Sequence, residues 1–212
     1  MNPSKHLIDL ENWNRKEHFE FFNSFDEPYY GVNVTIDVTA AYQLMKKEGH
    51  SFYLYYLYQC LAAAHQIDAF TLRIEDDQVY RYDRIDSGST ILRPDGTFGF
   101  GDFIYQPNFV DFQAGARAVM EQVQSETGIT RSPALNVIRF SALPWIDFTA
   151  LSHARSFGFR DSCPKISFGK ITDVDGKKTM PVSIHVNHAL VDGLRLGEYI
   201  TLYQELMNRT TL

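Results

Sequence analysis

A histidine near the C-terminus stands where a strand is expected to end, and an Asp-Gly pair follows it. Residues 183–193 read SIHVNHALVDG, in which His188 precedes Asp192 and Gly193 by a short loop. Apolar and polar residues alternate up to His188, which predicts a strand that ends there. An imidazole at a strand end is held rigidly and can still reach a cavity, and an unperturbed imidazole accepts a proton near neutral pH. His188 is therefore a candidate general base.

A metal site and a purely structural histidine are the other interpretations of this segment. His185 and His188 stand three apart, so on a strand their side chains point to opposite faces and do not converge on one ion. This disfavours a metal centre. A histidine that only fills space at a strand end meets no such objection, and the surrounding residues have to decide between that role and catalysis.

Length and composition bound the class of protein. The chain has 212 residues, of which 44% are hydrophobic and 22% charged, as expected for one globular domain over residues 1–212. Its formal charge of −6 disfavours a nucleic-acid partner, because phosphate binding requires a basic surface. Cys60 and Cys163 are too few for a disulfide framework and indicate a reducing compartment.

No segment has the pattern of a secretory signal or of a membrane span. The first residues carry charge early and contain no apolar run. The most apolar stretch, residues 52–67, is interrupted by Gln59, His65 and Gln66 and is too short and too polar to cross a bilayer. We therefore expect a cytoplasmic protein without a membrane partner.

The pattern along the chain predicts a mixed β-sheet with helices packed against it, an α/β fold of the two-layer sandwich type. Helical periodicity predicts helices at residues 15–24, 39–48, 52–66, 112–126 and after 193. Short β runs predict strands at residues 29–38, between 70 and 103, and at 136–141, 165–171 and 179–187. Thr39 is expected to cap the second helix, Gly49 to end it, and Asp175-Gly176 to form a hairpin turn.

Four short motifs resemble those of the chloramphenicol acetyltransferase family, in the family's order and spacing. Residues 187–193, NHALVDG, resemble the signature His-His-x-x-x-Asp-Gly, which the acyltransferase subunits of 2-oxo acid dehydrogenase complexes carry in variant form. Residues 13–19 resemble Trp-x-Arg-x-Glu-His-Phe, residues 140–145 resemble Ser-Ala-x-Pro-Trp, and residues 167–170 resemble a looser fourth element. The match covers residues 7–207. It favours the chloramphenicol branch, because no segment looks like the lipoyl and linker domains that the other branch normally carries.

The resemblance implies an acetyl-CoA-dependent O-acetyltransferase that acetylates chloramphenicol, a reaction of antibiotic resistance. In the family the second histidine of the signature is the general base, which is His188 here. It takes the proton of the acceptor hydroxyl, and that oxygen attacks the thioester of acetyl-CoA in a ternary complex without an acyl-enzyme. The serine of Ser-Ala-x-Pro-Trp donates to the oxyanion, a role that falls on Ser141, and a serine that merely ends a strand is the alternative.

The remaining family positions give further expectations. In the family the aspartate that falls on Asp192 pairs with the arginine that falls on Arg15, although a plain helix cap explains Asp192 equally well. Lys170 is expected at a CoA phosphate, Ser167 at a water or the pantetheine, and Trp145 as a wall of the CoA channel. A solvated lysine and a core tryptophan are the alternatives. Acetyl-CoA acts as a co-substrate, so neither a bound cofactor nor a metal is expected.

The acceptor pocket of the family is apolar and aromatic and lies across a trimer interface, where each histidine faces a pocket on its neighbour. Its positions fall on Phe21, Phe22, Tyr30 and Phe98, in agreement with the 16 Phe and 12 Tyr of the chain. The small residues of the segment 99–101 are expected to leave room for a facing chain or a ligand. A homotrimer that binds acetyl-CoA and a small hydroxyl compound is the resulting expectation.

Two positions depart from the family pattern. Asn187 replaces the first histidine of the signature, and Arg139 stands where many relatives have asparagine, two residues before Ser141. Residues 101–110 are unusually aromatic and match poorly. These departures leave two alternatives to chloramphenicol acetylation, namely the same chemistry on another hydroxyl acceptor, or a catalytically silent oligomeric binding protein with the same fold.

Overall fold

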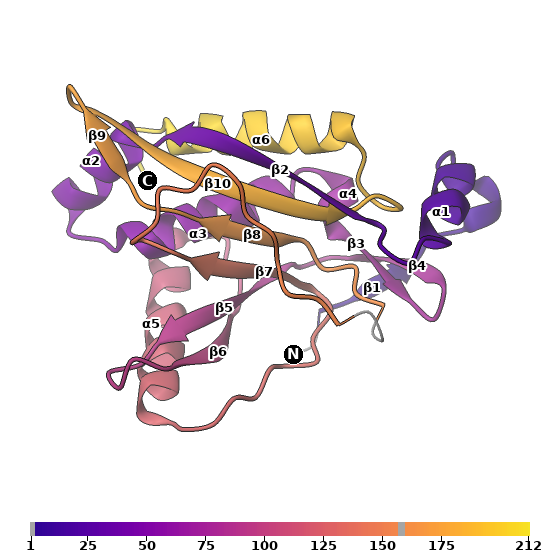
Figure 1. Ribbon diagram of the computed structural model, residues 1–212, viewed down its shortest axis with the longest axis horizontal. Coiled ribbons are helices and arrows are strands. Elements are labelled where there is room, and N and C mark those ends of the chain that lie inside the picture. Colours follow the sequence, from indigo (N-terminus) through magenta and orange to yellow (C-terminus); the bar gives the residue numbers. More distant parts are fainter. Residues whose placement is uncertain (1–2, 157–159) are drawn as a thin grey trace.

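A mixed β-sheet backed by helices forms the body of the protein (Figure 1). The computed structural model describes residues 3–156 and 160–212. The strands of the larger sheet are β2 (Tyr29–Asp37), β5 (Asp86–Leu92), β6 (Phe98–Phe103), β7 (Val137–Ala142), β8 (Lys165–Phe168), β9 (Thr172–Val174) and β10 (Lys177–Asn187). They lie in the order β2-β10-β8-β7-β5-β6, and β9 pairs with β10 outside that path. The strand pairs β5–β7 and β7–β8 are parallel and the others antiparallel, so the predicted mixed sheet is confirmed.

A second, small sheet joins the N-terminus to a hairpin. It consists of β1 (Lys5–Leu7), β3 (Leu72–Glu75) and β4 (Gln78–Tyr82), in the order β1-β4-β3. The sequence did not predict β1. All its residues are exposed, so it lacks the alternation of apolar and polar residues that marks a half-buried strand.

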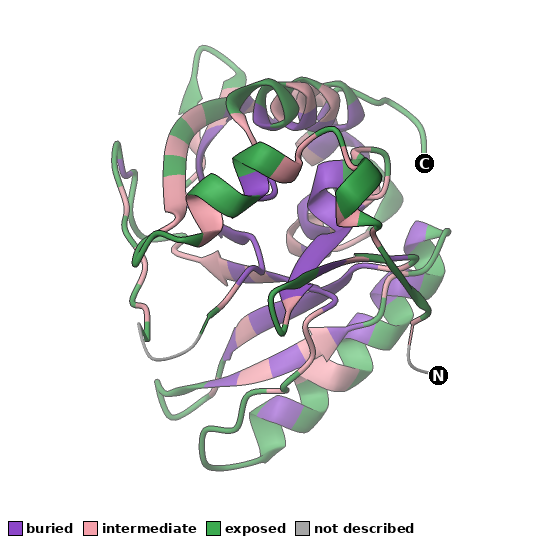
Figure 2. Cartoon of the chain, turned by 90° about the vertical axis from the view of Figure 1, so that its right-hand side faces the viewer, coloured by how far each residue is buried: buried purple, intermediate pink, exposed green. Residues whose placement is uncertain are grey.

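Helices pack on one face of the larger sheet. They are α1 (Lys16–Asn23), α2 (Thr39–Glu48), α3 (Phe52–Ala64), α4 (Asp68–Thr71), α5 (Phe109–Ser125) and α6 (Gly193–Met207), with a 3-10 turn η1 at Leu10–Asn12. Helices α2, α5 and α6 surround α3, and α1 stands apart beside the end of β10. Figure 2 shows exposed residues on the outer turns and buried residues toward the interior. None of the helices in the described ranges combines the length and apolar character that crossing a membrane requires.

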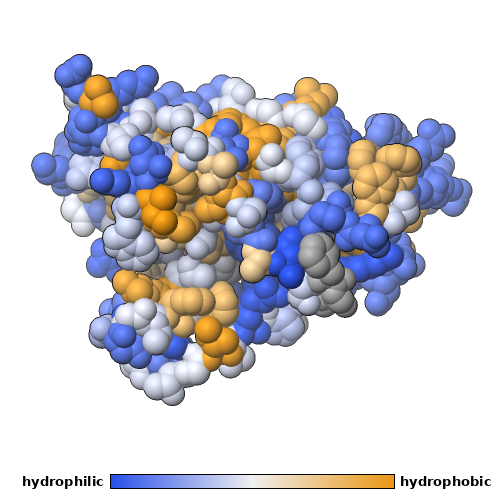
Figure 3. All heavy atoms as spheres, viewed as in Figure 1, coloured by the Kyte–Doolittle hydropathy of each residue, from blue (hydrophilic) through white to orange (hydrophobic). Residues whose placement is uncertain are grey.

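The opposite face of the sheet is polar. Side chains alternate along β10, so Val182 and Ile184 enter the hydrophobic core, while Ser183 and His185 point to the other face and contact each other. The long connection between β7 and β8 crosses this face in Figure 1. Figure 3, which has the same view, shows hydrophilic and hydrophobic side chains next to each other on this face.

The ends of α2 and α5 are set by capping groups. Gly49 adopts the left-handed conformation (φ 71°) and ends α2 as predicted. The predicted cap Thr39 is wrong. Its N–H donates to Asp37 Oδ1 at 3.0 Å, and its hydroxyl instead accepts the N–H of Lys178 at 2.9 Å. Helix α5 begins before the predicted residue 112, because Asn108 Oδ1 accepts the N–H of Val110 at 2.8 Å and caps it.

Two further local expectations can be compared with the structure. Asp175 and Gly176 have φ of 52° and 82° and form the predicted turn, although the hairpin joins β9, which was not predicted, to β10. The expectation that the glycines of segment 99–101 leave room for a ligand or a facing chain is wrong. A Cβ at Gly99 would lie 2.6 Å from Val123, and one at Gly101 would lie 2.7 Å from Val119, so helix α5 occupies that space.

Candidate active site

His188 follows the last residue of β10 and lies against two aromatic rings. Its backbone N–H donates to the carbonyl of Pro28 at 2.8 Å, which ties the strand end to the segment before β2. The imidazole stacks on Phe22 of α1, with ring centroids 3.8 Å apart and planes inclined by 5°. Tyr30 of β2 packs on it at a centroid distance of 4.5 Å. These contacts from β2, α1 and the strand end hold the ring in one position.

The two ring nitrogens of His188 differ in environment. Nδ1 is buried and has no hydrogen-bond partner within the described chain. Nε2 is not among the buried atoms, and the residue as a whole is partly exposed to solvent. A neutral imidazole arranged like this can receive a proton from an external group at Nε2.

Tyr30 adds a neutral hydroxyl beside the imidazole. Burial, with a smaller effect of the Asp192 carboxylate, raises the pKa of Tyr30 to about 12. The phenol therefore stays protonated at neutral pH. Its oxygen is buried and makes no hydrogen bond to any described residue, so it is a polar atom left unsatisfied within the described chain.

Asn187, the residue that departs from the family signature, stabilises the turn that follows β10. Its side chain is almost fully buried, and Oδ1 accepts the N–H of Ala189 at 2.9 Å. Its carbonyl accepts the N–H groups of Leu190 at 3.0 Å and Val191 at 2.9 Å. An asparagine is favoured in such a turn because its amide bonds the backbone two residues on. Asn187 thus supports the backbone on both sides of His188.

Arg15 and Asp192 form an ion pair close to the histidine. Arg15 Nη1 donates to Asp192 Oδ2, and Asp192 Oδ1 accepts the N–H of Arg195 at 2.9 Å as the cap of α6. Asp192 thus serves as ion-pair partner and as helix cap at once. Burial opposes ionisation of this carboxyl, but the Arg195 N–H and the Arg15 guanidinium outweigh it and lower the pKa of Asp192. The pair ties the start of α1 to the start of α6.

Ser141 and Ser167 lie side by side on the polar face. Strand β7 places Ser141 opposite Ser167 of β8, and β10 places Ser183 opposite Ser167. The Ser167 hydroxyl is buried without a hydrogen-bond partner in residues 3–156 and 160–212. Ser141 is partly exposed. A ligand oxygen beside these strands can therefore meet the Ser141 hydroxyl, whereas the Ser167 hydroxyl is covered by the chain.

A mostly apolar groove of about 530 Å³ opens beside Ser141. Trp145 and Phe98 form part of its lining. Trp145 is 68% exposed, which excludes the core tryptophan weighed from the sequence. Lys170 is exposed, and its N–H donates to the carbonyl of Ile146 at 2.8 Å, so it lies on the loop next to Trp145. The groove, the tryptophan and the lysine can accommodate a long ligand with an anionic end.

One chain holds the predicted site residues in two separate groups. His188 lies beyond Asn187, the last residue of β10, and Asn187 is roughly 13 Å from Ser183 at about 3.3 Å per residue. Ser183 is in turn the neighbour of Ser167. The aromatic positions divide in the same way, because Phe22 lies with His188 and Phe98 lies with Ser141 at the far edge of the sheet. We call the first group, Arg15, Phe22, Tyr30, His188 and Asp192, the His188 half-site. We call the second group, Phe98, Ser141, Trp145 and Ser167, the Ser141 half-site.

Phe21 has a different environment from the other predicted acceptor residues. It is 61% exposed, and its ring packs on Phe22 and Phe25, each at a centroid distance of 5.1 Å. It therefore lies on the outer side of α1, one layer removed from the imidazole. Only contact with another molecule can bury it.

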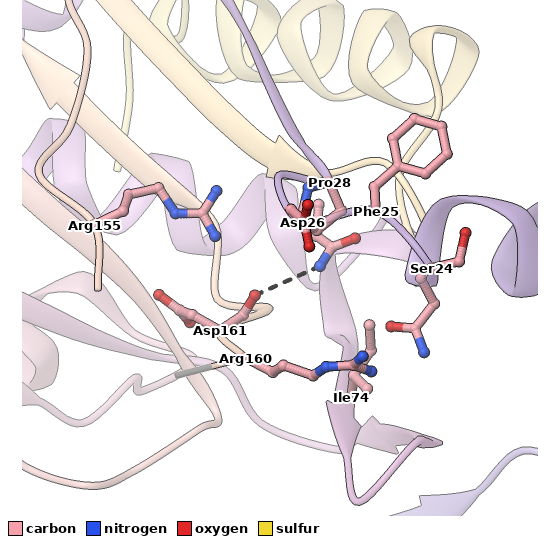
Figure 4. Close-up of a pocket in the computed structure, with 10 residues that line it drawn as sticks. Ser24, Phe25, Asp26, Pro28, Ile74, Arg155, Arg160 and Asp161 are labelled. Carbon is pink, nitrogen blue, oxygen red and sulfur yellow. Dashed lines mark hydrogen bonds between the residues drawn. The ribbon is translucent and has the colours of Figure 1, made fainter. Parts of the chain in front are cut away.

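A charged cavity of about 260 Å³ lies beside Asn187 (Figure 4). Asn187 Nδ2 donates to the carbonyl of Asp161 at 3.5 Å. In Figure 4, Arg155 and Asp26 lie above this hydrogen bond and Arg160 lies below it. None of these residues was predicted from the sequence as part of the site. The sequence of residues 151–156, LSHARS, carries no regular alternation of apolar and polar residues that could have pointed to Arg155.

Comparison with known proteins gives one consistent result. The family model described as chloramphenicol acetyltransferase matches residues 3–204. Chloramphenicol acetyltransferase 3 of Escherichia coli is 29% identical over 215 residues, with 98% of each chain covered. Chloramphenicol acetyltransferase 2 of Haemophilus influenzae is 27% identical over 200 residues, which cover 93% of this chain and 94% of that protein.

Solved structures agree with these sequence matches. A chloramphenicol acetyltransferase superposes with a TM-score of 0.88 at 30% identity, covering 96% of this chain and all of the other. A probable dihydrolipoamide acetyltransferase from Listeria monocytogenes has a TM-score of 0.67 at 10% identity, covering 92% of this chain and 90% of that one. The second likeness shows the fold alone.

Proposed function

The chain belongs to the chloramphenicol acetyltransferase family and is an acyltransferase, and on this premise we propose that it moves the acetyl group of acetyl-CoA to a hydroxyl of chloramphenicol. Chloramphenicol is proposed as the acceptor because the relatives are named for it. The observation that carries the mechanism is the position of His188, stacked on Phe22 with Nε2 left accessible. Acetyl-CoA is used as a co-substrate, and a cytoplasmic location is part of this proposal.

The proposed reaction needs one base and one oxyanion donor. His188 Nε2 takes the proton of the acceptor hydroxyl while the oxygen attacks the thioester carbonyl and a C–O bond forms. The carbonyl electrons move to its oxygen, to which the Ser141 hydroxyl donates. When this oxyanion collapses, the C–S bond breaks and the proton passes from His188 to the CoA sulfur. The products are an acetyl ester and free CoA thiol, and the imidazole returns to its neutral form.

The two half-sites support the proposal that the active enzyme is a homotrimer. The His188 half-site and the Ser141 half-site lie too far apart in one chain to act on one substrate. A cyclic assembly, in which unlike surfaces of successive copies meet, brings the His188 half-site of one copy to the Ser141 half-site of the next. The exposed Phe21 is then covered by the partner, in agreement with the acceptor role proposed for it together with Phe22, Tyr30 and Phe98.

The groove beside Ser141 supports a proposed position for acetyl-CoA. Trp145 forms a wall along the thioester arm, and Ser167 binds the pantetheine or a water through its unpartnered hydroxyl. Lys170 meets a phosphate of CoA from its exposed loop. In this arrangement Ser141 lies where the groove reaches the sheet, at the carbonyl to be attacked.

The test measures release of CoA thiol from acetyl-CoA with and without chloramphenicol. The wild-type enzyme is expected to release thiol only with the drug present, and His188→Ala to lower kcat by about 10²–10⁴-fold. His6→Ala, which removes an exposed histidine of β1, serves as the control with unchanged activity. Absence of drug-dependent thiol release rejects chloramphenicol as acceptor, and turnover that survives in His188→Ala rejects the proposed base.

A further inference from the structure

The sheet stops supporting the backbone of β10 just before the proposed base. Pairing of β10 with β8 ends at His185, and pairing with β2 ends at Asn187. Beyond Asn187 the chain turns toward α6, so the ladders with β2 and β8 no longer fix the two peptide groups that flank His188. The direction of the imidazole follows from these two peptides. The contacts that hold them therefore decide where Nε2 points.

A separate contact holds each of these two peptides. The N–H of His188 donates to the carbonyl of Pro28 at 2.8 Å, which fixes the peptide before the imidazole. The N–H of Ala189 donates to Asn187 Oδ1 at 2.9 Å, which fixes the peptide after it. The second bond passes over His188 and sets its backbone angle ψ, as an asparagine does in a turn. Pro28 and Asn187 therefore hold the backbone on both sides of the base.

The carboxamide of Asn187 is itself anchored at its other end. The residue is 3% exposed, and Nδ2 donates to the carbonyl of Asp161, at 3.5 Å, near the end of the β7–β8 connection (Figure 4). The Asp161 carboxylate in turn accepts from Lys165 Nζ at 2.5 Å and from the N–H of Cys163 at 2.9 Å. These bonds fix Asp161 to the start of β8, so the carbonyl that accepts from Asn187 stays in place. Rotation of the carboxamide would break its bonds to the turn and to this connection together.

Asn108 makes the same local bond as Asn187 at a place remote from the proposed chemistry. Its Oδ1 accepts the N–H of Val110, two residues on, at 2.8 Å. Asn108 is exposed and caps α5, and it belongs to neither half-site. The two asparagines therefore separate a turn bond that only stabilises the chain from a turn bond that also adjoins the base.

The stack between His188 and Phe22 makes the position of the turn exacting. The two rings lie 3.8 Å apart between centroids, with planes inclined by 5°. Phe22 belongs to α1 and not to the turn, so a shift of the His188 backbone moves the imidazole relative to that ring. A displacement of about 1 Å at a catalytic group can lower turnover about 10²-fold.

Building on the proposed acetyl transfer, we infer that Asn187 is a positioning residue of the general base. Its carboxamide links the peptide after His188 to the carbonyl of Asp161, and thereby holds the imidazole on Phe22 with Nε2 facing the acceptor hydroxyl. Asn187 acts through His188 and takes no part in the proton transfer itself. The asparagine that departs from the family signature thus serves the reaction.

Two variants of similar size isolate the turn bond. Asn187→Ala removes both bonds of the carboxamide, and Asn187→Ser restores a hydroxyl that can accept the N–H two residues on. Asn108→Ala removes the matched bond at the exposed position. Thiol release from acetyl-CoA with chloramphenicol gives kcat and both KM values, at a temperature below the Tm of every variant. The proton resonances of the His188 ring, assigned by their loss in His188→Ala, report the stack without any turnover, because a proton over an aromatic face is shielded.

We expect Asn187→Ala to lower kcat roughly 10- to 100-fold with both KM values unchanged, because the base is displaced while the substrates still bind. Asn187→Ser should regain kcat to within about fivefold of wild type. The His188 ring resonances should move toward unstacked values in Asn187→Ala and return in Asn187→Ser. Asn108→Ala should lower the Tm and leave kcat and these resonances unchanged.

Equal kcat values for Asn187→Ala and wild type overturn the inference and leave the proposed acetyl transfer standing, and so do equal losses in Asn187→Ala and Asn187→Ser. A lowered Tm in Asn187→Ala with unchanged His188 resonances also overturns it, because Asn187 then serves stability alone. If wild-type enzyme releases no thiol, the proposed acetyl transfer fails, and the His188 resonances alone decide whether Asn187 holds the imidazole.

Discussion

The imidazole of His188 and the ring of Phe22 lie parallel, with their centroids 3.8 Å apart. Helix α1 therefore helps the sheet to hold the proposed base in place. Phe22→Ala removes this support. Because an aromatic pair contributes about 0.5–1.5 kcal/mol, we expect kcat to fall roughly two- to tenfold, with KM for acetyl-CoA unchanged. Steady-state kinetics of thiol release measure both parameters.

Phe22→Tyr is the matched control, because it keeps the ring and therefore the stack. It should retain kcat within about twofold. If Phe22→Ala turned over as fast as wild type, the imidazole would be held by the strand end and Tyr30 alone, and α1 would have no role in catalysis.

The ion pair and the helix cap made by Asp192 can be separated by substitution. Asp192→Asn keeps an oxygen for the N–H of Arg195 but leaves Arg15 without its counter-charge, which should lower the free energy of unfolding by about 1–3 kcal/mol. Asp192→Ala also removes the cap and should cost about 1 kcal/mol more. Urea unfolding at a fixed protein concentration measures both values. Equal stability of the two variants would mean that the cap of α6 contributes nothing.

The local structure of the His188 half-site could be predicted because its signals are local. An alternating strand, a histidine at its end and an Asp-Gly pair at the next helix lie within residues 182–193. The partner Arg15 is 177 positions from Asp192, and only the family resemblance pointed to it. The predicted helix cap was wrong where the side chain bonds a strand instead of the helix. The Thr39 hydroxyl accepts the N–H of Lys178 on β10 and therefore does not cap α2.

The charges around Ser141 could not be predicted in the same way. Arg139 and Lys165 become neighbours only through the parallel pairing of β7 and β8, and no periodicity in the sequence encodes that pairing. Polar residues on a strand normally indicate a face in water. Here the long connection between β7 and β8 covers them, so Lys165 is almost fully buried. Which polar residues are buried depends on tertiary contacts.

His153 should make the stability of the fold sensitive to mild acid. Burial, followed by His185 and Lys165, lowers its pKa from the ordinary 6.5 to about 4. Between these pH values the unfolded chain binds a proton at this residue that the folded chain does not. Its contribution to stability is therefore complete above pH 6.5 and is lost as the pH falls toward about 4.

The free energy of unfolding, measured in urea from pH 7 to about pH 4, tests this prediction. His153→Phe should show a shallower decline than wild type, because the ring stays and the proton-binding group is gone. Carboxylates titrate alike in both proteins, so the difference in slope isolates His153. His6→Phe, at an exposed position, should keep the wild-type slope. Parallel curves for wild type and His153→Phe would show that this histidine keeps its ordinary proton affinity in the folded chain.

Mixing two inactive variants tests whether neighbouring copies share each active site. His188→Ala retains an intact Ser141 half-site, and Ser141→Ala retains an intact His188 half-site. In a trimer in which successive copies join unlike half-sites, each mixed trimer contains one interface with both residues intact. Random assembly of equal amounts should therefore restore about a quarter of wild-type turnover, although each parent alone is expected to lose about 10²-fold or more.

The measurement is thiol release after the two variants are unfolded and refolded together, compared with the same variants refolded apart and then mixed. Activity that appears only after joint refolding requires exchange of chains within one oligomer. Refolding His188→Ala with the double variant His188→Ala, Ser141→Ala is the matched control, because no copy then supplies the base. A jointly refolded mixture no more active than its parents would mean that both residues act within one chain. His188 lies beyond the end of β10, which is itself roughly 13 Å from Ser183, and this separation argues against that outcome.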